Sequence, residues 1–264
     1  MATPSTATIL LVHGGWHTPD HYAHLTSNLK ALGHKVHVPR LPSVNGARPP
    51  NADLFTDSAF IRSYVESRVD AGDKLVVIMH SYGGQVGTDA LFGLSVEARK
   101  QQNLPGGVAR LIYITAFALS PGQSMNWMVK KMGDEALMPL AFDFAEDGTV
   151  VDRDPASLLV GPGLSEKELS AFVSSLVVWN GKAMYQDIEN CAWCEKVSIS
   201  YVCTKNDMTV PLKYQQTMIE WMREEGKEVQ TFELETGHCP QFTKPRELAD
   251  IIHRIVRDEE SSWC

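Results

Sequence analysis

The sequence predicts an α/β protein built on a mostly parallel sheet flanked by helices. Six apolar runs rich in β-branched residues recur along the chain, and segments with apolar residues at helical spacing separate them. Alternation of this kind is typical of parallel sheets whose two faces are covered by helices. A length of 264 residues allows one such domain with an insertion and is short for two independent domains.

The predicted elements alternate between strand and helix. The expected strands are residues 8–12, 35–39, 75–79, 108–115, 197–203 and 229–234. The expected helices, in which apolar residues recur every three or four positions, include residues 22–32, 59–69, 212–225 and 246–256. Glycine stands where three of these helices are expected to end, at Gly33, Gly72 and Gly226.

Residues 120–194 interrupt this alternation. The segment has no obvious buried strand, and it is rich in methionine and aromatic residues with helical turns between them. We therefore predict a core formed by residues 1–119 and 195–264, with a helical cap, or lid, inserted as residues 120–194.

Composition and charge narrow the range of partners. The net charge of −8 argues against nucleic acid and anionic membranes, because both bind clustered Lys and Arg. The start of the chain lacks the basic and apolar segments of a signal peptide, and the longest apolar run, residues 111–119, is too short to cross a membrane. The five cysteines are odd in number and scattered, unlike a disulfide framework. We expect a soluble cytoplasmic protein with reduced thiols.

The main functional signal lies at the end of the third predicted strand. This strand runs into residues 80–84, His-Ser-Tyr-Gly-Gly, and a helical segment follows. A serine at such a sharp turn exposes its oxygen at the carboxyl end of the sheet, where the helix N-terminus favours developing negative charge. We predict Ser81 as a nucleophile, although Met79 replaces the first glycine of the Gly-x-Ser-x-Gly pattern. The alternative is an ordinary strand-to-helix turn.

Other loops supply the partners that such a serine needs. Gly15, in a His-Gly-Gly-Trp loop after the first strand, and Tyr82 are the predicted backbone donors to an oxyanion. Asp207 follows the fifth predicted strand and is expected to orient the base, although aspartate is also a common turn former there. His238, after the last strand, is the predicted base, so that serine, acid and histidine follow one another along the chain.

The remaining candidate sites carry weaker signals. His80 adjoins the predicted nucleophile on a strand-like segment, so the two side chains are expected to point to opposite faces. Cys191 and Cys194 have the spacing of a redox or zinc half-site, but no second pair accompanies them and packed thiols are expected. His17 and His21 have metal-ligand spacing but lack the glutamate of the zinc-protease pattern. We predict no metal and no organic cofactor.

In these residues the chain resembles the plant methylesterase and hydroxynitrile lyase branch of the α/β-hydrolases. The similarity lies in residues 13–16, 32–36, 201–204, 237–238 and 243–245, and the elbow at residues 79–84 is similar to that of short fungal hydrolases. The resemblance covers the core and is weak across the cap. It implies the α/β-hydrolase fold with a six-stranded sheet.

The resemblance also implies roles for individual residues. It assigns the triad to Ser81, Asp207 and His238, and the oxyanion donors to Gly15 and Tyr82. Lyase members carry threonine at the position of Gly14 and lysine at that of Cys239, so their absence here favours ester or lactone hydrolysis. Two alternatives stay open, namely a non-hydrolytic lyase or cyclase of a natural-product pathway, and a ligand-binding receptor that retains the triad.

The cap sequence indicates an apolar substrate. Its methionine and aromatic residues are Trp127, Met128, Met132, Met138, Phe142, Phe144, Trp179 and Met184. The predicted substrate-binding residues are Trp16, Trp127, Met128, Trp179 and Met184. Such residues are also typical of a cap's own core. Because methionine-rich surfaces adapt their shape, we expect the small-molecule partner to be a bulky apolar ester or lactone. The chain could also form a homodimer, and the sequence leaves its oligomeric state open.

Overall fold

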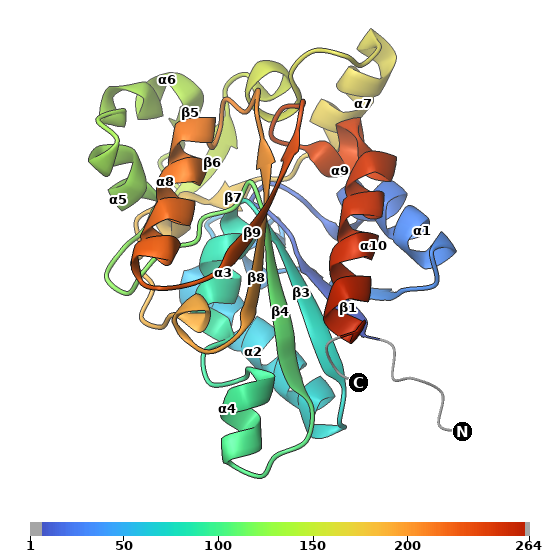
Figure 1. The fold of residues 1–264 in the computed structure, drawn as a ribbon. Helices are drawn as coiled ribbons and strands as arrows, with labels where there is room; N and C mark the ends of the chain where they lie inside the picture. The colour runs from blue at the N-terminus through green and yellow to red at the C-terminus, as the bar shows by residue number, and fades with distance from the viewer. Residues whose placement is uncertain (1–6, 262–264) are drawn as a thin grey trace.

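The computed structural model describes residues 7–261 and has an α/β architecture (Figure 1). Within these residues the main sheet has six strands in the order β2-β1-β3-β4-β8-β9, and every pair of neighbours is parallel. The strands are β1 (Thr8–Val12), β2 (Lys35–His37), β3 (Lys74–His80), β4 (Gly107–Ile114), β8 (Ser198–Thr204) and β9 (Val229–Leu234). The predicted six-stranded, mostly parallel sheet is confirmed.

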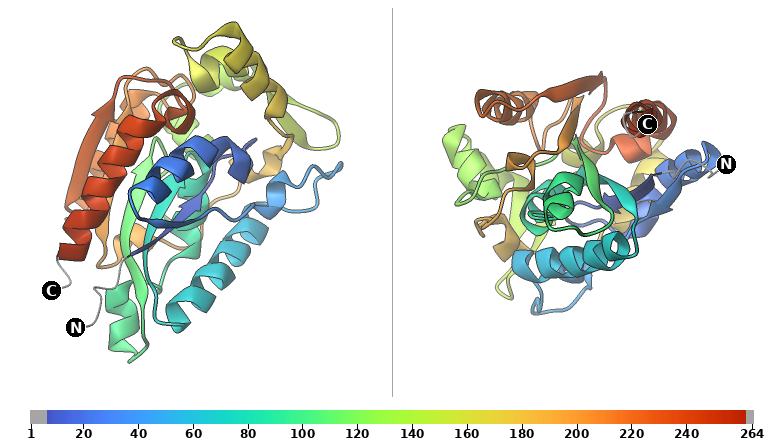
Figure 2. Two further views of the ribbon diagram at one scale, coloured as in Figure 1. Left: turned by 90° about the vertical axis from the view of Figure 1, so that its right-hand side faces the viewer. Right: turned by 60° about the horizontal axis from the view of Figure 1, so that its bottom comes forward.

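Helices cover both faces of the main sheet (Figures 1 and 2). One face carries α1 (Ala23–Ala31) and α10 (Pro245–Ser261). The other carries α2 (Leu54–Asp70), α3 (Tyr82–Ala90) and α8 (Leu212–Glu224). The remaining core helices are η1 (Pro19–Tyr22), η2 (Pro42–Val44), α4 (Val96–Gln101) and α9 (Pro240–Thr243).

The strands divide the hydrophobic core between these two faces. Alternate side chains of a strand point to opposite faces of the sheet. In β1, Ile9 and Leu11 therefore pack towards α1 and α10, whereas Leu10 and Val12 pack towards α2 and α3. Because both faces are buried, the strands read as continuous apolar runs in the sequence.

Between β4 and β8 the chain leaves the main sheet, and Figure 1 shows most of the inserted elements above the carboxyl ends of its strands. They are α5 (Met125–Lys131), η3 (Glu135–Leu137), α6 (Met138–Ala141), β5 (Phe142–Phe144), β6 (Thr149–Asp152), the π-helix η4 (Ala156–Val160), α7 (Glu166–Ser175), β7 (Trp179–Asn180), η5 (Gly181–Met184) and η6 (Ala192–Cys194). Within the insertion, β5, β6 and β7 form an antiparallel sheet. We call it the small sheet. The sequence does not predict it, because strands of two to four residues are too short to show alternation.

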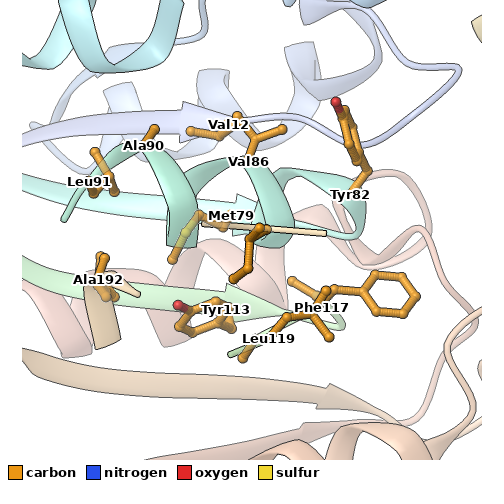
Figure 3. Close-up of a cluster of buried hydrophobic side chains, with 14 of the residues drawn as sticks. Val12, Met79, Tyr82, Val86, Ala90, Leu91, Tyr113, Phe117, Leu119 and Ala192 are labelled. Carbon is orange, nitrogen blue, oxygen red and sulfur yellow. The ribbon is translucent and has the colours of Figure 1, made fainter. Parts of the chain in front are cut away.

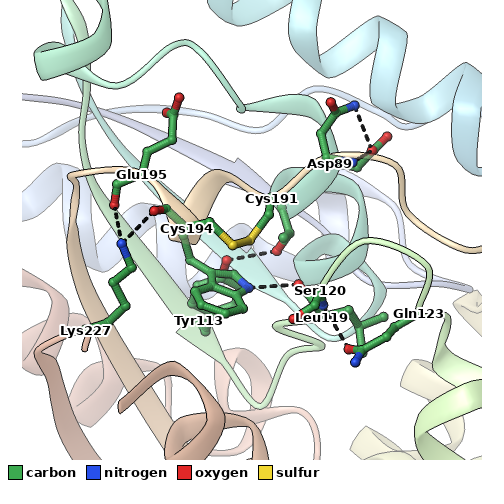
Figure 4. Close-up of a disulfide and its surroundings, with 12 residues drawn as sticks. Asp89, Tyr113, Leu119, Ser120, Gln123, Cys191, Cys194, Glu195 and Lys227 are labelled. Carbon is green, nitrogen blue, oxygen red and sulfur yellow. Dashed lines mark hydrogen bonds between the residues drawn. A yellow bond between two sulfur atoms is a disulfide. The ribbon is translucent and has the colours of Figure 1, made fainter. Parts of the chain in front are cut away.

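Cys191 and Cys194 form a disulfide (Figure 4), so the expectation of reduced, packed thiols at this pair is wrong. The turn of η6 brings the two Cα atoms to 5.3 Å, a separation that disulfides require. Lys227 Nζ donates hydrogen bonds to the carbonyl oxygens of Cys194 and Glu195 beside it. Within residues 7–261, Cys203 and Cys239 are the free cysteines, and both are buried.

Among residues 7–261 no helix is both long enough and apolar enough to cross a membrane.

Met79, at the first position of the elbow pattern, is accommodated by the glycine at position 87. Figure 3 shows Met79 among the buried side chains of β3, α3 and β4. A Cβ atom on Gly87 would lie 2.4 Å from Met79 Sδ, which is closer than atoms can approach. The missing side chain in α3 therefore provides the space that the Met79 side chain fills.

We expect Gly87→Ala to lower the free energy of unfolding by about 1–3 kcal/mol through overpacking against Met79. In the absence of that contact, alanine would instead stabilise a helix interior relative to glycine. In a Met79→Ala background, Gly87→Ala should accordingly be neutral or stabilising. Urea denaturation of the four proteins in this double-mutant cycle measures the coupling between the two positions. If Gly87→Ala lowers the free energy of unfolding equally in both backgrounds, overpacking against Met79 is contradicted.

Candidate active site

Ser81 lies at the sharp turn between β3 and α3. Its φ of 54° and ψ of −123° fall outside the regions that residues with a side chain normally adopt, so the turn is strained. Backbone hydrogen bonds hold it: Ser81 N donates to Ile114 O at 3.4 Å, and Gly84 N and Phe117 N donate to Ser81 O at 2.9 and 3.2 Å. The surrounding backbone thereby fixes the serine at the carboxyl end of β3.

The helix that follows Ser81 begins in close contact with the end of β1. A Cβ atom on Gly83 would lie 2.2 Å from Val12 O, so only glycine fits at this position. This approach brings the N-terminus of α3, with the Tyr82 N–H, next to the loop after β1 that contains Gly15. Both backbone groups predicted as oxyanion donors belong to residues that line one cavity with Ser81.

Asp207 and His238 form a buried pair, with His238 Nδ1 2.8 Å from Asp207 Oδ2. Thr204 Oγ1 donates to the same oxygen at 2.9 Å, and Thr115 Oγ1 donates to it as well. The backbone N–H groups of residues 209–210 donate to Oδ1 at 2.8 Å each. Burial raises the pKa of Asp207, but His238 and these donors outweigh burial and hold the pKa below its ordinary value. Asp207 therefore stays ionised and fixes Nδ1 of His238.

A second buried network lies behind Ser81 and involves His80. His80 Nε2 is 2.8 Å from His238 O, and a carbonyl oxygen only accepts, so Nε2 carries the proton. His80 Nδ1, at 2.7 Å, then accepts from the Tyr22 hydroxyl, which itself accepts from Gly14 N at 3.0 Å. Burial lowers the pKa of His80 to about 3, so this ring is neutral at physiological pH. The network connects the loop after β1, the elbow and the loop that carries His238.

A cavity of about 40 Å³ opens beside Ser81, and its walls are mainly apolar. Of the predicted substrate-binding residues, Trp16, Trp179 and Met184 line it. Five further residues line the cavity that were not predicted from the sequence as binding residues, namely Phe117, Met125, Asn126, Val129 and Thr209. The i, i+4 spacing of Met125 and Val129 was the available signal for the face that α5 turns to the site.

Trp127 and Met128, which were also predicted to bind substrate, are not among the residues that line this cavity. Trp127 packs edge to face against Trp221, with ring centroids 5.6 Å apart. Met128 is fully buried in the hydrophobic core. Residues of a helix point in different directions, so α5 presents Met125, Asn126 and Val129 to the cavity while Trp127 and Met128 pack elsewhere.

The small sheet closes the cavity with aromatic side chains. Phe142 of β5 stacks on Trp16 at 5.5 Å, and Trp179 of β7 meets Trp16 edge to face at 5.2 Å. Trp16 Nε1 donates to Val150 O at 2.9 Å, and the Trp179 ring also contacts Tyr82 at 4.6 Å. The insertion thus contacts both loops that carry the predicted oxyanion donors.

Asp57 of α2 forms a buried anchor behind Tyr82 that the sequence analysis missed. Its carboxyl accepts from Ser43 N at 2.9 Å, from Ser43 Oγ at 2.5 Å and from the Tyr82 hydroxyl at 2.8 Å. Trp179 Nε1 donates to Ser43 Oγ at 3.1 Å, which extends the network to the small sheet. Burial raises the pKa of Asp57 to about 6 despite these donors. An aspartate within a helix gives no sequence signal for such a role.

The histidines with metal-ligand spacing have other partners. His17 Nδ1 lies 2.6 Å from Gly15 O, and its Nε2 lies 3.4 Å from Cys239 Sγ. His21 Nε2 lies 3.0 Å from Ser175 Oγ. Among residues 7–261 no group of three or more His, Cys, Asp or Glu side chains is arranged to hold a metal ion.

Comparisons with known proteins relate this arrangement to a family. The sequence profile of a family described as "Alpha/beta hydrolase family" matches residues 9–251. The chain is 30% identical over 251 residues to "Probable hydrolase R7" of Phoma sp., covering 94% of this chain and 97% of that protein. It is 24% identical over 262 residues to "Methylesterase 10" of Arabidopsis thaliana, covering 94% and 90%.

Solved structures show the same fold at lower sequence identity. An extracellular alpha/beta-hydrolase from a Paenibacillus species matches with a TM-score of 0.74 and 19% identity, covering 94% of this chain and 98% of that one. A pyrethroid hydrolase from Sphingobium faniae matches with a TM-score of 0.69 and 19% identity, covering 96% and 98%. Similarity at this level of identity shows the fold and does not assign a substrate.

Proposed function

We propose that this chain is a serine hydrolase that cleaves a carboxylic ester or lactone of a mainly apolar small molecule. The chain belongs to the alpha/beta hydrolase family and has its fold. The resemblance to that family seen in the sequence is confirmed. The observation that carries the proposed activity is the buried Asp207–His238 pair. The His238 ring centroid lies 4.9 Å from that of His80, which directly precedes Ser81 at the strained turn. The His80 network supports it, because it joins the loop of His238 to that turn.

In the proposed reaction, Ser81 Oγ attacks the ester carbonyl while His238 accepts the serine proton. Asp207 holds Nδ1, so Nε2 is the nitrogen that takes this proton, and Asp207 stabilises the resulting imidazolium. The N–H groups of Gly15 and Tyr82 donate to the oxyanion of the tetrahedral intermediate.

The intermediate then collapses to an acyl-enzyme. The bond from the carbonyl carbon to the alkoxy oxygen breaks, and the departing oxygen takes the proton from His238. In the second half of the reaction His238 removes a proton from water, which attacks the acyl carbon. The bond from the acyl carbon to Ser81 Oγ then breaks, the carboxylic acid leaves, and Ser81 Oγ recovers its proton from His238.

We also propose that residues 120–194 act as the cap of this site. A cavity of about 40 Å³ holds roughly one or two water molecules, far less than a bulky ester. Phe142 and Trp179 of the small sheet cover it by packing on Trp16. Movement of the small sheet away from Trp16 would therefore enlarge the site for the substrate.

Covalent trapping tests the proposed function. A fluorophosphonate probe should attach to one residue, Ser81, and p-nitrophenyl acetate should release a burst of p-nitrophenol of about one equivalent per active site. His238→Ala should slow the labelling strongly, because the serine loses its base. Failure to label Ser81 in a protein that converts a pathway substrate would favour the lyase or cyclase alternative, and ligand-induced thermal stabilisation without turnover would favour the receptor.

A further inference from the structure

Asp152, the last residue of β6, carries a buried carboxyl oxygen that the proposed mechanism does not use. Its Oδ1 accepts a hydrogen bond from Asp154 N at 2.9 Å. Its Oδ2 is buried and has no hydrogen-bond partner within residues 7–261. Buried polar atoms are nearly always paired, because an unmade hydrogen bond costs free energy. The unpaired oxygen therefore calls for an explanation.

The register of the small sheet places Asp152 on the face that covers the cavity. Asp152 pairs with Phe142 across β5 and β6, and Val150, two residues earlier, pairs with Trp179 across β6 and β7. Directly opposed residues and residues two apart share one face of an antiparallel sheet. Phe142 and Trp179 both line the cavity with Ser81, and Asp152, which does not line it, lies on the same face of the small sheet.

Asp152 also interacts electrostatically with the loop that carries His238. Burial raises the pKa of Asp152 to about 6, and the His238 imidazolium acts in the opposite direction. Burial raises the pKa of Cys239, the next residue in the chain, and the charge of Asp152 contributes to that rise. The carboxyl therefore lies within electrostatic reach of both residues of this loop.

The insertion packs against the loop of His238 shortly after Asp152, because a Cβ atom on Gly237 would lie 2.4 Å from Val160 O. This position indicates which part of a substrate Asp152 would meet. In the proposed reaction His238 delivers its proton to the alkoxy oxygen that leaves. The alcohol portion of the ester must therefore lie towards the imidazole, whereas the carbonyl oxygen lies towards Gly15 and Tyr82. A group beside His238 consequently faces the alcohol portion.

We propose that Asp152 is a specificity-determining residue whose Oδ2 accepts a hydrogen bond from a neutral hydroxyl or N–H group on the alcohol portion of the substrate. This inference rests on the proposed ester or lactone hydrolysis and narrows its substrate class. An alcohol portion without a donor would leave the buried oxygen unpaired, at a cost in binding. A permanent cation is disfavoured, because it would repel the imidazolium that forms on His238 during turnover.

Three acetate esters that share the acyl group test the inference. They are phenyl acetate, 3-hydroxyphenyl acetate and 3-methoxyphenyl acetate, of which only the second carries a donor. We expect kcat/KM for the hydroxyl ester to exceed that for the methoxy ester by about tenfold or more, as one hydrogen bond to a charged acceptor allows. Asp152→Ala should reduce this ratio to near unity, and Asp152→Asn should give an intermediate ratio because its amide oxygen is a neutral acceptor.

Asp143→Ala is the matched control, because Asp143 is an exposed carboxylate on the neighbouring strand and pairs with Val151, on the opposite face of the small sheet. It should keep the wild-type ratio. The same ratio should appear in the affinities of Ser81→Ala for the two esters, measured by quenching of tryptophan fluorescence, which needs no turnover.

The outcomes separate the two proposals. The role of Asp152 is overturned if the wild type and Asp152→Ala show the same kcat/KM ratio between the hydroxyl and methoxy esters. It is also overturned if Ser81→Ala binds the two esters equally well. In either case Ser81-dependent hydrolysis stands. If none of the esters is hydrolysed in a Ser81-dependent way, the proposed function is weakened, and the binding ratio still decides whether Asp152 recognises the hydroxyl group.

Discussion

Ser81→Ala is expected to lower kcat by about 10⁴-fold or more on any ester that the protein hydrolyses. The substitution removes the oxygen that attacks the ester in the proposed mechanism, whereas the hydrogen bonds that hold the turn come from the backbone of residue 81. Circular dichroism and the thermal midpoint should therefore change little. Steady-state kinetics with p-nitrophenyl acetate measure the loss, and retention of more than about a hundredth of kcat contradicts the nucleophile assignment.

Ser95→Ala provides a matched control, because Ser95 also stands at the start of a helix. Its hydroxyl oxygen accepts a hydrogen bond from Ala98 N at 3.1 Å and caps α4, which lies at the end of the main sheet opposite the small sheet (Figure 1). Loss of this cap should cost about 1 kcal/mol of stability and leave kcat unchanged. The two serines should thus give opposite results, with activity lost at Ser81 and stability lost at Ser95.

Asp207→Asn is expected to lower kcat by about 10⁴-fold while the fold is retained. An asparagine amide can donate to His238 Nδ1, which would leave the proton on Nε2 and abolish its ability to accept the serine proton. Thr115→Val removes one donor to the carboxylate and preserves its charge, so it should cost far less activity. An Asn variant that keeps a tenth of the wild-type kcat would argue against this role of Asp207.

The wild type and Asp207→Asn should also differ in the free energy of unfolding, by an amount that depends on pH. The folded protein holds the pKa of Asp207 below the ordinary value of 3.8, so the carboxylate contributes stability above that pH. The contribution should decline as the pH falls below 3.8 towards the folded pKa. Urea denaturation of the wild type and Asp207→Asn at pH 7 and at pH 3 measures this difference, which should be larger at pH 7.

The sequence locates the main-sheet strands well because their signals are local. Strands are expected at residues 8–12 and 229–234, and these are the bounds of β1 and β9. The edge strand β2 ends at His37 instead of Pro39, which has no N–H group to donate.

Helix bounds and short elements are harder to predict. α2 begins at Leu54 rather than at Ala59, because Asp53 caps it by accepting from Thr56 N. Three polar residues in a row, at positions 56–58, interrupt the apolar spacing and hide the start of the helix. The small sheet is invisible for a similar reason, since three residues such as Phe142–Phe144 show no measurable period.

Contacts between distant segments account for the remaining differences. Trp16, Trp179 and Met184 line the cavity, but composition alone does not distinguish them from Trp127 and Met128, which face elsewhere. Asp57 and Asp152 are ordinary aspartates in the sequence, and only burial reveals that one anchors Tyr82 and that the other has an unpaired oxygen.

By itself the sequence determined the α/β class, the positions of the main strands, and the chain order of Ser81, Asp207 and His238 at strand ends. Each of these depends on periodicity or turn chemistry within a few neighbouring residues. Only the tertiary structure decided that His238 meets Asp207, that Cys191 and Cys194 are joined, and which side chains cover Ser81. Those facts depend on the relative directions of side chains from separate elements, which packing sets and local patterns do not encode.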